Sequence, residues 1–286
     1  MAKPFLKWAG GKTSLLPELL QAAPDQIETY YEPFVGGGAL FFALQSAGRF
    51  KRAVLSDSNR ELINAYVQVR DDVDGLVRAL SVHQRKYREA ADRAEYYYTI
   101  RGKKLTCSLG GAANLIFLNK TCYNGLYRVN SKGGFNVPHG RYVNPTICDE
   151  GSLRKASEAL QGVELRVADF ADGPRLAGAG DFVYFDPPYV PLSETAYFTS
   201  YTAKEFGMVE QERLARAAAE LAERGSRVAL SNSGHPEVKS MYSSEVFKLD
   251  EVHAKRAINS DAKKRGPVRE YLIQSIVNPP FKASSA

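Results

Sequence analysis

The sequence predicts an α/β fold built on a doubly wound, mostly parallel sheet. Short apolar segments rich in β-branched and aromatic residues are expected to be strands at residues 29–33, 53–56, 163–167, 182–185, 227–231, 245–252 and 270–276. Between them, helical patterns occupy residues 39–45, 60–69 and 203–224. Strands that alternate with helices in this way favour helices on both faces of one sheet.

The first expected strand leads into a glycine turn and a helix, in the stretch "EPFVGGGALFF" at residues 32–42. Such a turn lets a ligand approach the backbone while the N-terminus of the helix points toward it. A tight connection without any ligand explains a lone glycine run equally well. Asp57 follows about 20 residues later at the end of the next strand, in place to hold ribose hydroxyls, and this favours a nucleoside-bearing cofactor.

The charge beside this turn narrows the choice of cofactor. Glu32 lies directly ahead of the glycines, and the run does not match GxGxxG. A negative charge there disfavours a pyrophosphate and favours a positively charged ligand. S-adenosyl-L-methionine carries a sulfonium and an ammonium and no phosphate, so we expect it to be the cofactor.

A second motif, "VYFDPPYVPL" at residues 183–192, ends an expected strand on a carboxylate. Proline has no N–H and holds φ near −65°, so Pro187 and Pro188 form a stiff corner that offers carbonyl acceptors and no donors. The exocyclic amine of a nucleobase has two hydrogens to donate, one to Asp186 and one to the Pro187 carbonyl, while Tyr189 stacks on the base. These four residues are the predicted catalytic group; a Pro-Pro turn with Asp186 as a cap is the structural alternative.

The middle of the chain is basic. Residues 96–148 contain no Asp or Glu, although the whole chain has 32 of them and a net charge of +6. The same segment contains Arg101, Lys103, Lys104, Lys120, Arg128, Lys132 and Arg141. Tyrosines and phenylalanines lie between these cations, which is typical of a nucleic-acid-binding surface, although an ordinary solvated surface that lacks acids is the alternative.

Other features of the sequence exclude several classes of protein. There is no apolar stretch long enough to cross a membrane and no secretory leader, so we expect a cytoplasmic protein, bacterial or phage, associated with the nucleoid. The three cysteines have no CxxC or histidine-containing spacing, so neither a disulfide framework nor a metal site is expected. A monomer is sufficient for the chemistry proposed above.

Four blocks in order resemble those of Dam-type (D12 class) DNA adenine methyltransferases: "FLKWAGGK" (5–12), "EPFVGGGALFF" (32–42), "NKTCYNGLYRVNSKGGFNVPHGRY" (119–142) and "DPPYVPLSETAYFTSY" (186–201). The resemblance covers nearly the whole chain. It implies a Rossmann-like methyltransferase sheet with an inserted, mostly helical target-recognition domain that carries a β-hairpin. The catalytic, cofactor-binding domain would comprise residues 1–58 and 150–286, and the DNA target-recognition domain residues 59–149.

The resemblance also implies which residues bind the cofactor. These are Trp8, Gly10, Gly11, Lys12, Glu32, Pro33, Phe34, Gly36, Gly38, Asp57, Asp169, Phe170 and Asp186. Within this set Asp57 would hold the ribose and Asp169 would meet the adenine of the cofactor. Trp8 has a second interpretation, as a packing residue that seats the N-terminal segment in the core.

Residues that would contact double-stranded DNA follow from the same resemblance. They are Lys7, Arg101, Lys120, Asn124, Leu126, Arg128, Asn136, Pro138, Tyr142 and Tyr201. Arg128 would read guanine, because a guanidinium can donate two hydrogen bonds to its major-groove edge. The implied site is GATC, with the target adenine flipped out of the duplex. Departures at Cys122, Tyr127 and His139 leave the preference for flanking sequence open.

Two other functions are compatible with parts of the sequence. An amino-methyltransferase acting on cytosine in DNA, or on RNA, would share the cofactor half and differ in residues 126–142. A non-catalytic DNA-binding module would keep the basic segment and tolerate loss of the motif carboxylate. Asp186 and Tyr189 are intact, which counts against the second alternative.

Overall fold

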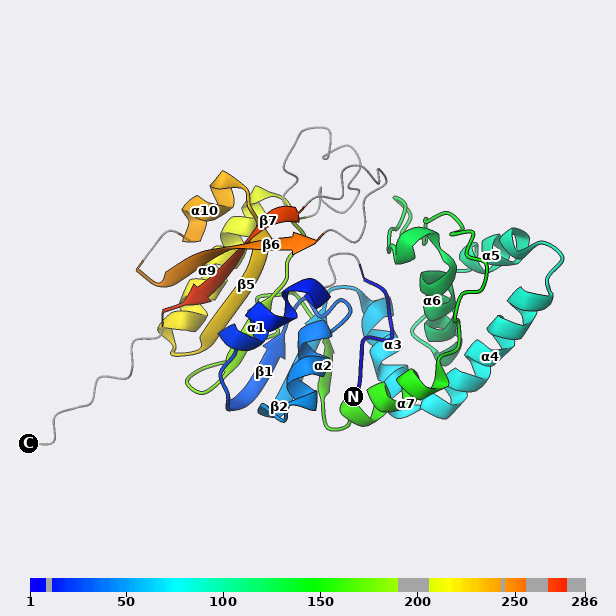
Figure 1. The fold of residues 1–286 in the computed structure, drawn as a ribbon, viewed down its shortest axis with the longest axis horizontal. Helices are drawn as coiled ribbons and strands as arrows, with labels where there is room; N and C mark the ends of the chain where they lie inside the picture. Colours follow the sequence, from blue (N-terminus) through cyan, green and yellow to red (C-terminus); the bar gives the residue numbers. More distant parts are fainter. Residues whose placement is uncertain (9–11, 190–205, 243–244, 256–266, 277–286) are drawn as a thin grey trace, which may run out of the picture.

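The described chain forms one seven-stranded sheet with helices on both sides (Figure 1). The computed structural model describes residues 1–8, 12–189, 206–242, 245–255 and 267–276. The strands are β1 (Ile27–Glu32), β2 (Phe50–Asp57), β3 (Glu164–Val167), β4 (Phe182–Phe185), β5 (Arg227–Ser233), β6 (Phe247–Lys255) and β7 (Pro267–Ser275). Their order is β3-β2-β1-β4-β5-β7-β6, and β7 is antiparallel to both of its neighbours while β1 to β5 are parallel. The predicted doubly wound α/β fold is confirmed.

The helices match the predicted alternation, with several additions. They are η1 (Lys12–Leu15), α1 (Leu16–Ala22), α2 (Ala39–Ser46), α3 (Arg60–Asp71), α4 (Val73–Glu89), α5 (Arg93–Arg101), α6 (Leu109–Thr121), η2 (Tyr123–Gly125), α7 (Glu150–Ala159), α9 (Met208–Glu223) and α10 (Pro236–Tyr242). The helix expected from residue 203 begins at Met208, and residues 203–205 lie outside the described part of the chain. The short helices α1 and α10, of seven residues each, are among these additions.

The central strand β4 separates two cores. Phe182 and Tyr184 face the core that contains α2 and α3, whereas Val183 and Phe185 face the core that contains α9. All four side chains are buried. Successive side chains of a strand point to opposite faces, so a strand buried on both sides appears in the sequence as a continuous apolar run.

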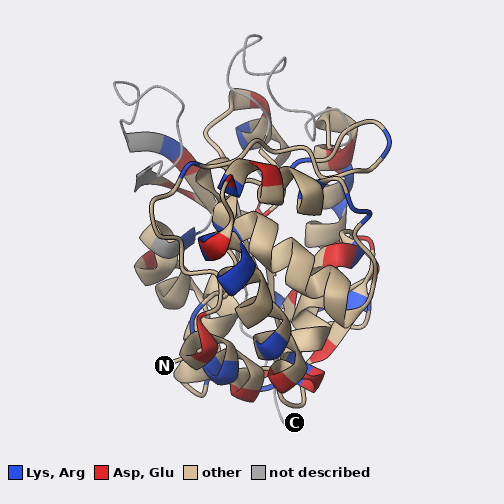
Figure 2. Cartoon of the chain, turned by 90° about the vertical axis from the view of Figure 1, so that its right-hand side faces the viewer, with Lys and Arg blue, Asp and Glu red and all other residues tan. Residues whose placement is uncertain are grey.

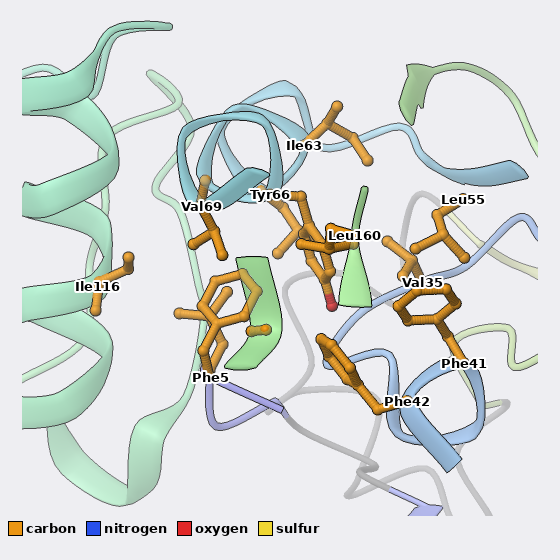
Figure 3. Close-up of a cluster of buried hydrophobic side chains, with 14 of the residues drawn as sticks. Phe5, Val35, Phe41, Phe42, Leu55, Ile63, Tyr66, Val69, Ile116 and Leu160 are labelled. Carbon is orange, nitrogen blue, oxygen red and sulfur yellow. The ribbon is translucent and has the colours of Figure 1, made fainter. Parts of the chain in front are cut away.

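The first core extends beyond the sheet into the helices on its right in Figure 1. Helix α3 contacts β2 on one side and α6 on the other. In Figure 3 the α3 side chains Ile63, Tyr66 and Val69 lie between Phe41, near the sheet, and Ile116 of α6. We call residues 73–148 the helical module. It shares a continuous apolar core with the sheet, and the boundaries expected at residues 58/59 and 149/150 stay a prediction.

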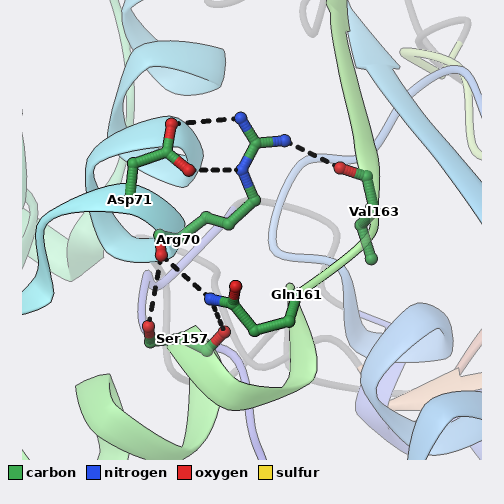
Figure 4. Close-up of polar contacts among 5 residues, drawn as sticks. All are labelled: Arg70, Asp71, Ser157, Gln161 and Val163. Atoms are coloured by element: carbon green, nitrogen blue, oxygen red, sulfur yellow. Dashed lines mark hydrogen bonds and ion pairs between the residues drawn. The ribbon is translucent and has the colours of Figure 1, made fainter.

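A set of polar contacts at the end of α3 fixes the point where the chain re-enters the sheet (Figure 4). Arg70 donates from Nη1 to the Val163 carbonyl at 2.7 Å and forms an ion pair with Asp71. The Arg70 carbonyl accepts from Gln161 Nε2 at 3.0 Å. These bonds join α3 to α7 and to the segment before β3, so the two ends of the helical module are held together.

The module also contains the expected hairpin, in a short form. Asn130 N donates to the Gly134 carbonyl at 2.9 Å and Asn136 N donates to the Arg128 carbonyl at 2.7 Å. A single antiparallel bridge joins Val129 to Phe135. Among the described helices, none has the length and apolar character needed to cross a membrane.

Replacing Phe117, the fully buried centre of the helical module, should destabilise the whole protein. Its ring contacts His83 at 4.9 Å and Tyr87 at 5.7 Å between ring centroids. Phe117→Ala should cost about 3–5 kcal/mol of unfolding free energy. Because the module and the sheet share a core, far-UV circular dichroism and the fluorescence of Trp8, the single tryptophan, should report one common transition in urea.

Val82→Ala is the control, because Val82 is an apolar residue of the same module with 40% of its surface exposed, and the substitution should change the midpoint much less. Two separate transitions in the Phe117 variant would contradict the shared core.

Candidate active site and nucleic-acid interface

Four carboxylates gather at the carboxyl edge of the parallel strands. Glu32 is the last residue of β1 and Asp57 the last residue of β2, while Asp169 and Asp186 follow β3 and β4. These four strands are neighbours in the sheet. Ligands of open α/β sheets bind outside the carboxyl ends of the strands, so this edge is the candidate active site.

The glycine turn after β1 requires glycine at two positions. Gly36 and Gly38 have φ of +45° and +66°. A Cβ on Gly36 would lie 2.7 Å from Trp8 Cδ1, and one on Gly38 would lie 2.8 Å from Tyr66 Oη. Tyr66 also donates to the Gly36 carbonyl at 3.0 Å. Trp8 and Tyr66 therefore pack directly on the turn, which agrees with the packing interpretation of Trp8 and places it beside the expected cofactor residues.

Asp57 holds the turn in place. It accepts a hydrogen bond from Gly36 N at 3.4 Å and another from Asn59 N at 2.9 Å. Burial raises the pKa of Asp57 to about 6, and these backbone donors oppose the shift. The structure thus brings Asp57 to the glycine turn, as expected, while its role toward a ribose stays a prediction.

Glu32 is a buried acid with a strongly shifted pKa. It is 3% exposed and accepts from Tyr30 Oη at 2.9 Å. Burial, followed by the charge of Asp186, raises the pKa of Glu32 to about 8. The side chain is therefore mostly protonated at neutral pH until a positive charge is placed beside it.

Asp186 lies at the centre of the edge, with partners from two other elements. Its Oδ1 is 2.8 Å from Lys12 Nζ of η1 and accepts from Ser231 Oγ of β5 at 3.2 Å. Burial raises the pKa of Asp186, whereas Lys12 and Ser231 act in the opposite direction. The Asp186 side chain is 21% exposed, so a ligand can reach the carboxylate.

Tyr189 lies close to Asp186 in the sequence, and a hydrogen bond from the Tyr189 hydroxyl fixes the position of the side chain. The hydroxyl donates to Glu270 Oε2 of β7 at 2.8 Å. Lys12 Nζ lies 4.5 Å from the centre of the Tyr189 ring, so the ammonium contacts both the ring and the Asp186 carboxylate. Lys12 itself is only 6% exposed.

Asp169 and Phe170 form a second cluster beyond β3. Asp169 accepts from Ala171 N at 2.9 Å and pairs with Arg213 of α9. Arg213 Cζ lies 4.3 Å from the centre of the Phe170 ring, and Phe170 stacks on Phe34 at 5.4 Å. The structure brings the predicted residues Phe34, Asp169 and Phe170 together.

The N-terminal segment is fastened to the helical module through one side chain. Asn119 accepts from Lys7 N at 2.8 Å and donates to the Lys7 carbonyl at 2.6 Å. Asn119 also donates to the Gly125 carbonyl at 3.2 Å, and a Cβ on Gly125 would lie 2.6 Å from Lys7 Cβ. Lys7 is therefore packed against the loop that carries Asn124 and Leu126.

The expected DNA-contact residues lie on this loop and the hairpin that follows. Arg128 donates from Nε and Nη2 to the Asn136 carbonyl at 3.1 and 2.6 Å. Lys7 Nζ lies 4.6 Å from the centre of the Tyr142 ring. The Pro138 carbonyl accepts from Tyr123 N at 2.8 Å. The hairpin is linked to the glycine turn through Trp8, which packs on Gly36 and stacks on Tyr127 with 5.3 Å between ring centroids.

A cavity of about 370 Å³ opens beside Lys7, and it is lined by Lys7, Lys120, Tyr142, Val143, Asn144, Pro145 and Thr146. Burial and the neighbouring Lys7 lower the pKa of Lys120. Arg101 lies apart from this cavity, where it donates to the Val137 carbonyl at 3.3 Å. In Figure 2, which faces the helical module, Lys and Arg are interspersed with Asp and Glu, so the basic character belongs to residues 96–148 and not to the whole face.

Some predicted residues cannot be placed, and some important ones were not predicted. Gly10, Gly11 and Tyr201 lie outside the described residues. Asn119, Ser231 and Glu270 were missed; a polar residue inside or at the end of a buried apolar segment, as in "LIFLNK" and "RVALS", is the signal that could have found the first two. In the part of the chain that the structure describes, no three His, Cys, Asp or Glu side chains form a metal-binding group.

Comparison with known proteins agrees with this geometry. A family model described as D12 class N6 adenine-specific DNA methyltransferase matches residues 8–258. The chain is 44% identical over 287 residues to the type II methyltransferase M.MjaIII of Methanocaldococcus jannaschii, covering 96% of this chain and 99% of the relative. It is 39% identical to the type II methyltransferase M1.LlaDCHI of Lactococcus lactis subsp. cremoris, covering 96% of each chain.

A third relative is the DNA adenine methylase of Salmonella typhi, which is 36% identical over 272 residues, covering 94% of each chain. The match of the family model over most of the sequence and the length of these alignments agree with the order of the four sequence blocks. The chain belongs to the D12 class of N6 adenine-specific DNA methyltransferases.

Proposed function

We propose that this DNA adenine methyltransferase transfers a methyl group from S-adenosyl-L-methionine to the 6-amino group of the adenine in GATC, after that adenine has flipped out of the duplex. The arrangement of Asp186 and Tyr189 beside Glu32, at the ends of the adjacent strands β4 and β1, is the observation that carries the proposal. It puts an acceptor for the amine, a ring for stacking and a buried acid for a cationic cofactor at one edge.

The residues at the glycine turn fit the cofactor. S-adenosyl-L-methionine supplies, when bound, a methyl group on a positively charged sulfur. Glu32 offers a buried carboxylate to the positive end of the molecule, and the φ values of Gly36 and Gly38 let the backbone approach it closely. Asp57 would hold the ribose hydroxyls, and Asp169 with Phe170 would bind the adenine end.

The motif of Asp186 to Tyr189 would prepare the target amine. Asp186 accepts one N–H and the Pro187 carbonyl accepts the other, so the nitrogen is drawn toward tetrahedral geometry and its lone pair is directed away from both acceptors. Holding the base in this orientation removes much of the entropic cost of the reaction. A covalent enzyme intermediate is unnecessary in this scheme.

The position of Lys12 supports this assignment. Its ammonium occupies Asp186 Oδ1 and the face of the Tyr189 ring, the same two groups assigned to the target adenine. The site therefore suits an N–H donor that lies over an aromatic ring. We infer that the entering base displaces Lys12 from at least one of these groups.

In this proposal, the loop and hairpin at residues 124–142 recognise the base sequence of the DNA. Arg128 would donate to a guanine, and Lys7 and Tyr142, which are in contact, would lie close to the duplex. Lys120 and Arg101 would contribute to binding through phosphates, so affinity should fall steeply with salt. We also propose that the protein acts as a monomer in the cytoplasm, where it is associated with the nucleoid.

Asp186→Ala should abolish methyl transfer, because the amine loses its carboxylate acceptor, while DNA affinity changes by no more than a few-fold. Transfer of labelled methyl groups to a GATC duplex measures the first quantity and fluorescence anisotropy of the same duplex measures the second. Asp25→Ala is the matched control, since the Asp25 side chain is 96% exposed ahead of β1, at the opposite edge of the sheet. Retained transfer in the Asp186 variant would refute the assigned role.

Binding of the cofactor should depend on the ionisation of Glu32. Since the pKa of Glu32 is about 8 without ligand, a positively charged cofactor has to displace a proton below that pH. The Kd of the wild type should therefore rise by up to about tenfold for each pH unit below 8, whereas Glu32→Gln should bind more weakly at pH 9 and lose this dependence. Isothermal titration calorimetry between pH 6 and 9 measures both effects.

Stability supplies an independent control for the same variant. The folded-state pKa of Glu32, about 8, is above its ordinary value of 4.5, so the associated stability is fully present below pH 4.5 and lost as the pH rises toward 8. Glu32→Gln should therefore be increasingly more stable than the wild type across this window. Parallel stability curves for the two proteins would show that Glu32 is not buried as described.

Arg128→Ala should relax discrimination at one guanine of the site at a cost of about 1–3 kcal/mol. Initial rates on GATC and on duplexes with one substituted base pair measure the change. Lys132→Ala, in the exposed turn of the same hairpin, should weaken binding equally on every duplex if it weakens binding at all. Equal turnover of correct and substituted duplexes by the wild type would refute sequence reading at GATC.

A further inference from the structure

The structure holds the Pro187–Pro188 corner through two buried amide side chains that the reaction itself does not use. We propose that Gln211 of α9 and Asn232 of β5 are positioning residues, which orient this corner so that the Pro187 carbonyl meets the target amine. This inference rests on the proposed function of the corner.

The contacts form a chain of three hydrogen bonds. Ser233 N donates to Asn232 Oδ1 at 2.8 Å, and Asn232 Nδ2 donates to Gln211 Oε1 at 2.9 Å. Gln211 Nε2 then donates to the Pro188 carbonyl at 3.0 Å. Both amide side chains are completely buried, with 0% of their surface exposed.

The donor-to-acceptor direction of these three hydrogen bonds is fixed at both ends of the series. The backbone N–H of Ser233 can only donate, and the carbonyl of Pro188 can only accept. Each amide must therefore place its oxygen toward the Ser233 end and its NH₂ group toward the Pro188 end. Because neither side chain has access to water, reversing one amide would bring two oxygens or two NH₂ groups together at a cost that solvent cannot relieve.

A corner of two prolines needs this kind of support. Pro187 and Pro188 have no N–H, so their own backbone cannot anchor the turn by donating hydrogen bonds. The Gln211 amide supplies a donor from outside and fixes the Pro188 carbonyl. The orientation of that peptide group determines where Tyr189 begins and restricts the neighbouring Pro187 carbonyl.

The other members of the corner are anchored from different elements. Ser231 Oγ donates to Asp186, and Tyr189 Oη donates to Glu270. Within the described residues no donor meets the Pro187 carbonyl oxygen. The hydrogen bonds through Gln211 thus complete the support of the corner. They leave the Pro187 carbonyl, which the proposed mechanism uses, available to the substrate.

Gln211→Glu tests the proposal, because the change preserves shape and alters only the donor. A protonated glutamic acid can still donate to the Pro188 carbonyl, whereas the ionised form places a negative oxygen against it. We expect kcat to fall by about 100-fold at pH 9, as for an ångström-scale misplacement of a catalytic group, and to recover toward the wild-type value at pH 6. KM for the duplex and for S-adenosyl-L-methionine should change by no more than a few-fold.

Gln161→Glu is the matched control. Gln161 Nε2 also donates to a backbone carbonyl, that of Arg70 at 3.0 Å, but the residue is exposed and remote from the site. Its pH profile of kcat should coincide with that of the wild type. The melting temperature of every variant is measured at each pH, so that a loss of folded protein is not counted as a loss of kcat.

Asn232→Asp is a second variant in case the first does not fold. An aspartate at 232 reverses the Gln211 amide and turns its oxygen toward the Pro188 carbonyl, so the same pH-dependent loss of kcat is expected. A folded variant whose kcat profile parallels the wild type, or whose defect lies only in KM, would overturn the positioning role. If the wild type itself does not methylate GATC, the proposed site fails, and the inference is then tested on the adenine that the wild type does methylate.

Discussion

The structure has to accommodate several buried carboxylates at one edge of the sheet. Parallel strands bring Glu32, Asp57 and Asp186 there together, and burial makes their charged forms costly. The protein offsets this cost with Lys12, with backbone N–H groups of the glycine turn and with tyrosine and serine hydroxyls. An edge built in this way attracts ligands that bring positive charge and N–H donors.

The candidate site has two parts, the glycine turn and the proline corner, and they differ in the backbone groups that they expose. The glycine turn removes side chains so that a ligand can approach the backbone, and Trp8 and Tyr66 pack tightly against it. At the proline corner, Pro187 and Pro188 have no N–H groups, so their backbone offers only carbonyl acceptors. Each half needs support from elements far away in the sequence, namely α3 for the turn and α9, β5 and β7 for the corner.

Much of the fold could be predicted from the sequence, because buried parallel strands are continuous apolar runs that polar residues terminate. The strand before Asp186 is predicted to the residue, and the glycine turn and the acid at Asp57 lie where the pattern places them. The contacts that the supporting side chains make could not be predicted in this way. Asn119, Ser231 and Glu270 act through partners from 6 to 112 positions away, and single-sequence patterns contain no information on such pairs.

The shared core between the sheet and the helical module has a consequence for exchange of this module among relatives. Helix α3 presents Ile63, Tyr66 and Val69 to that core, and Tyr66 also bonds to the glycine turn. A helical module grafted from a relative would have to match this inner surface as well. If residues 124–142 read the DNA as proposed, new target preferences are more easily acquired by changing this loop and hairpin than by transplanting the module whole.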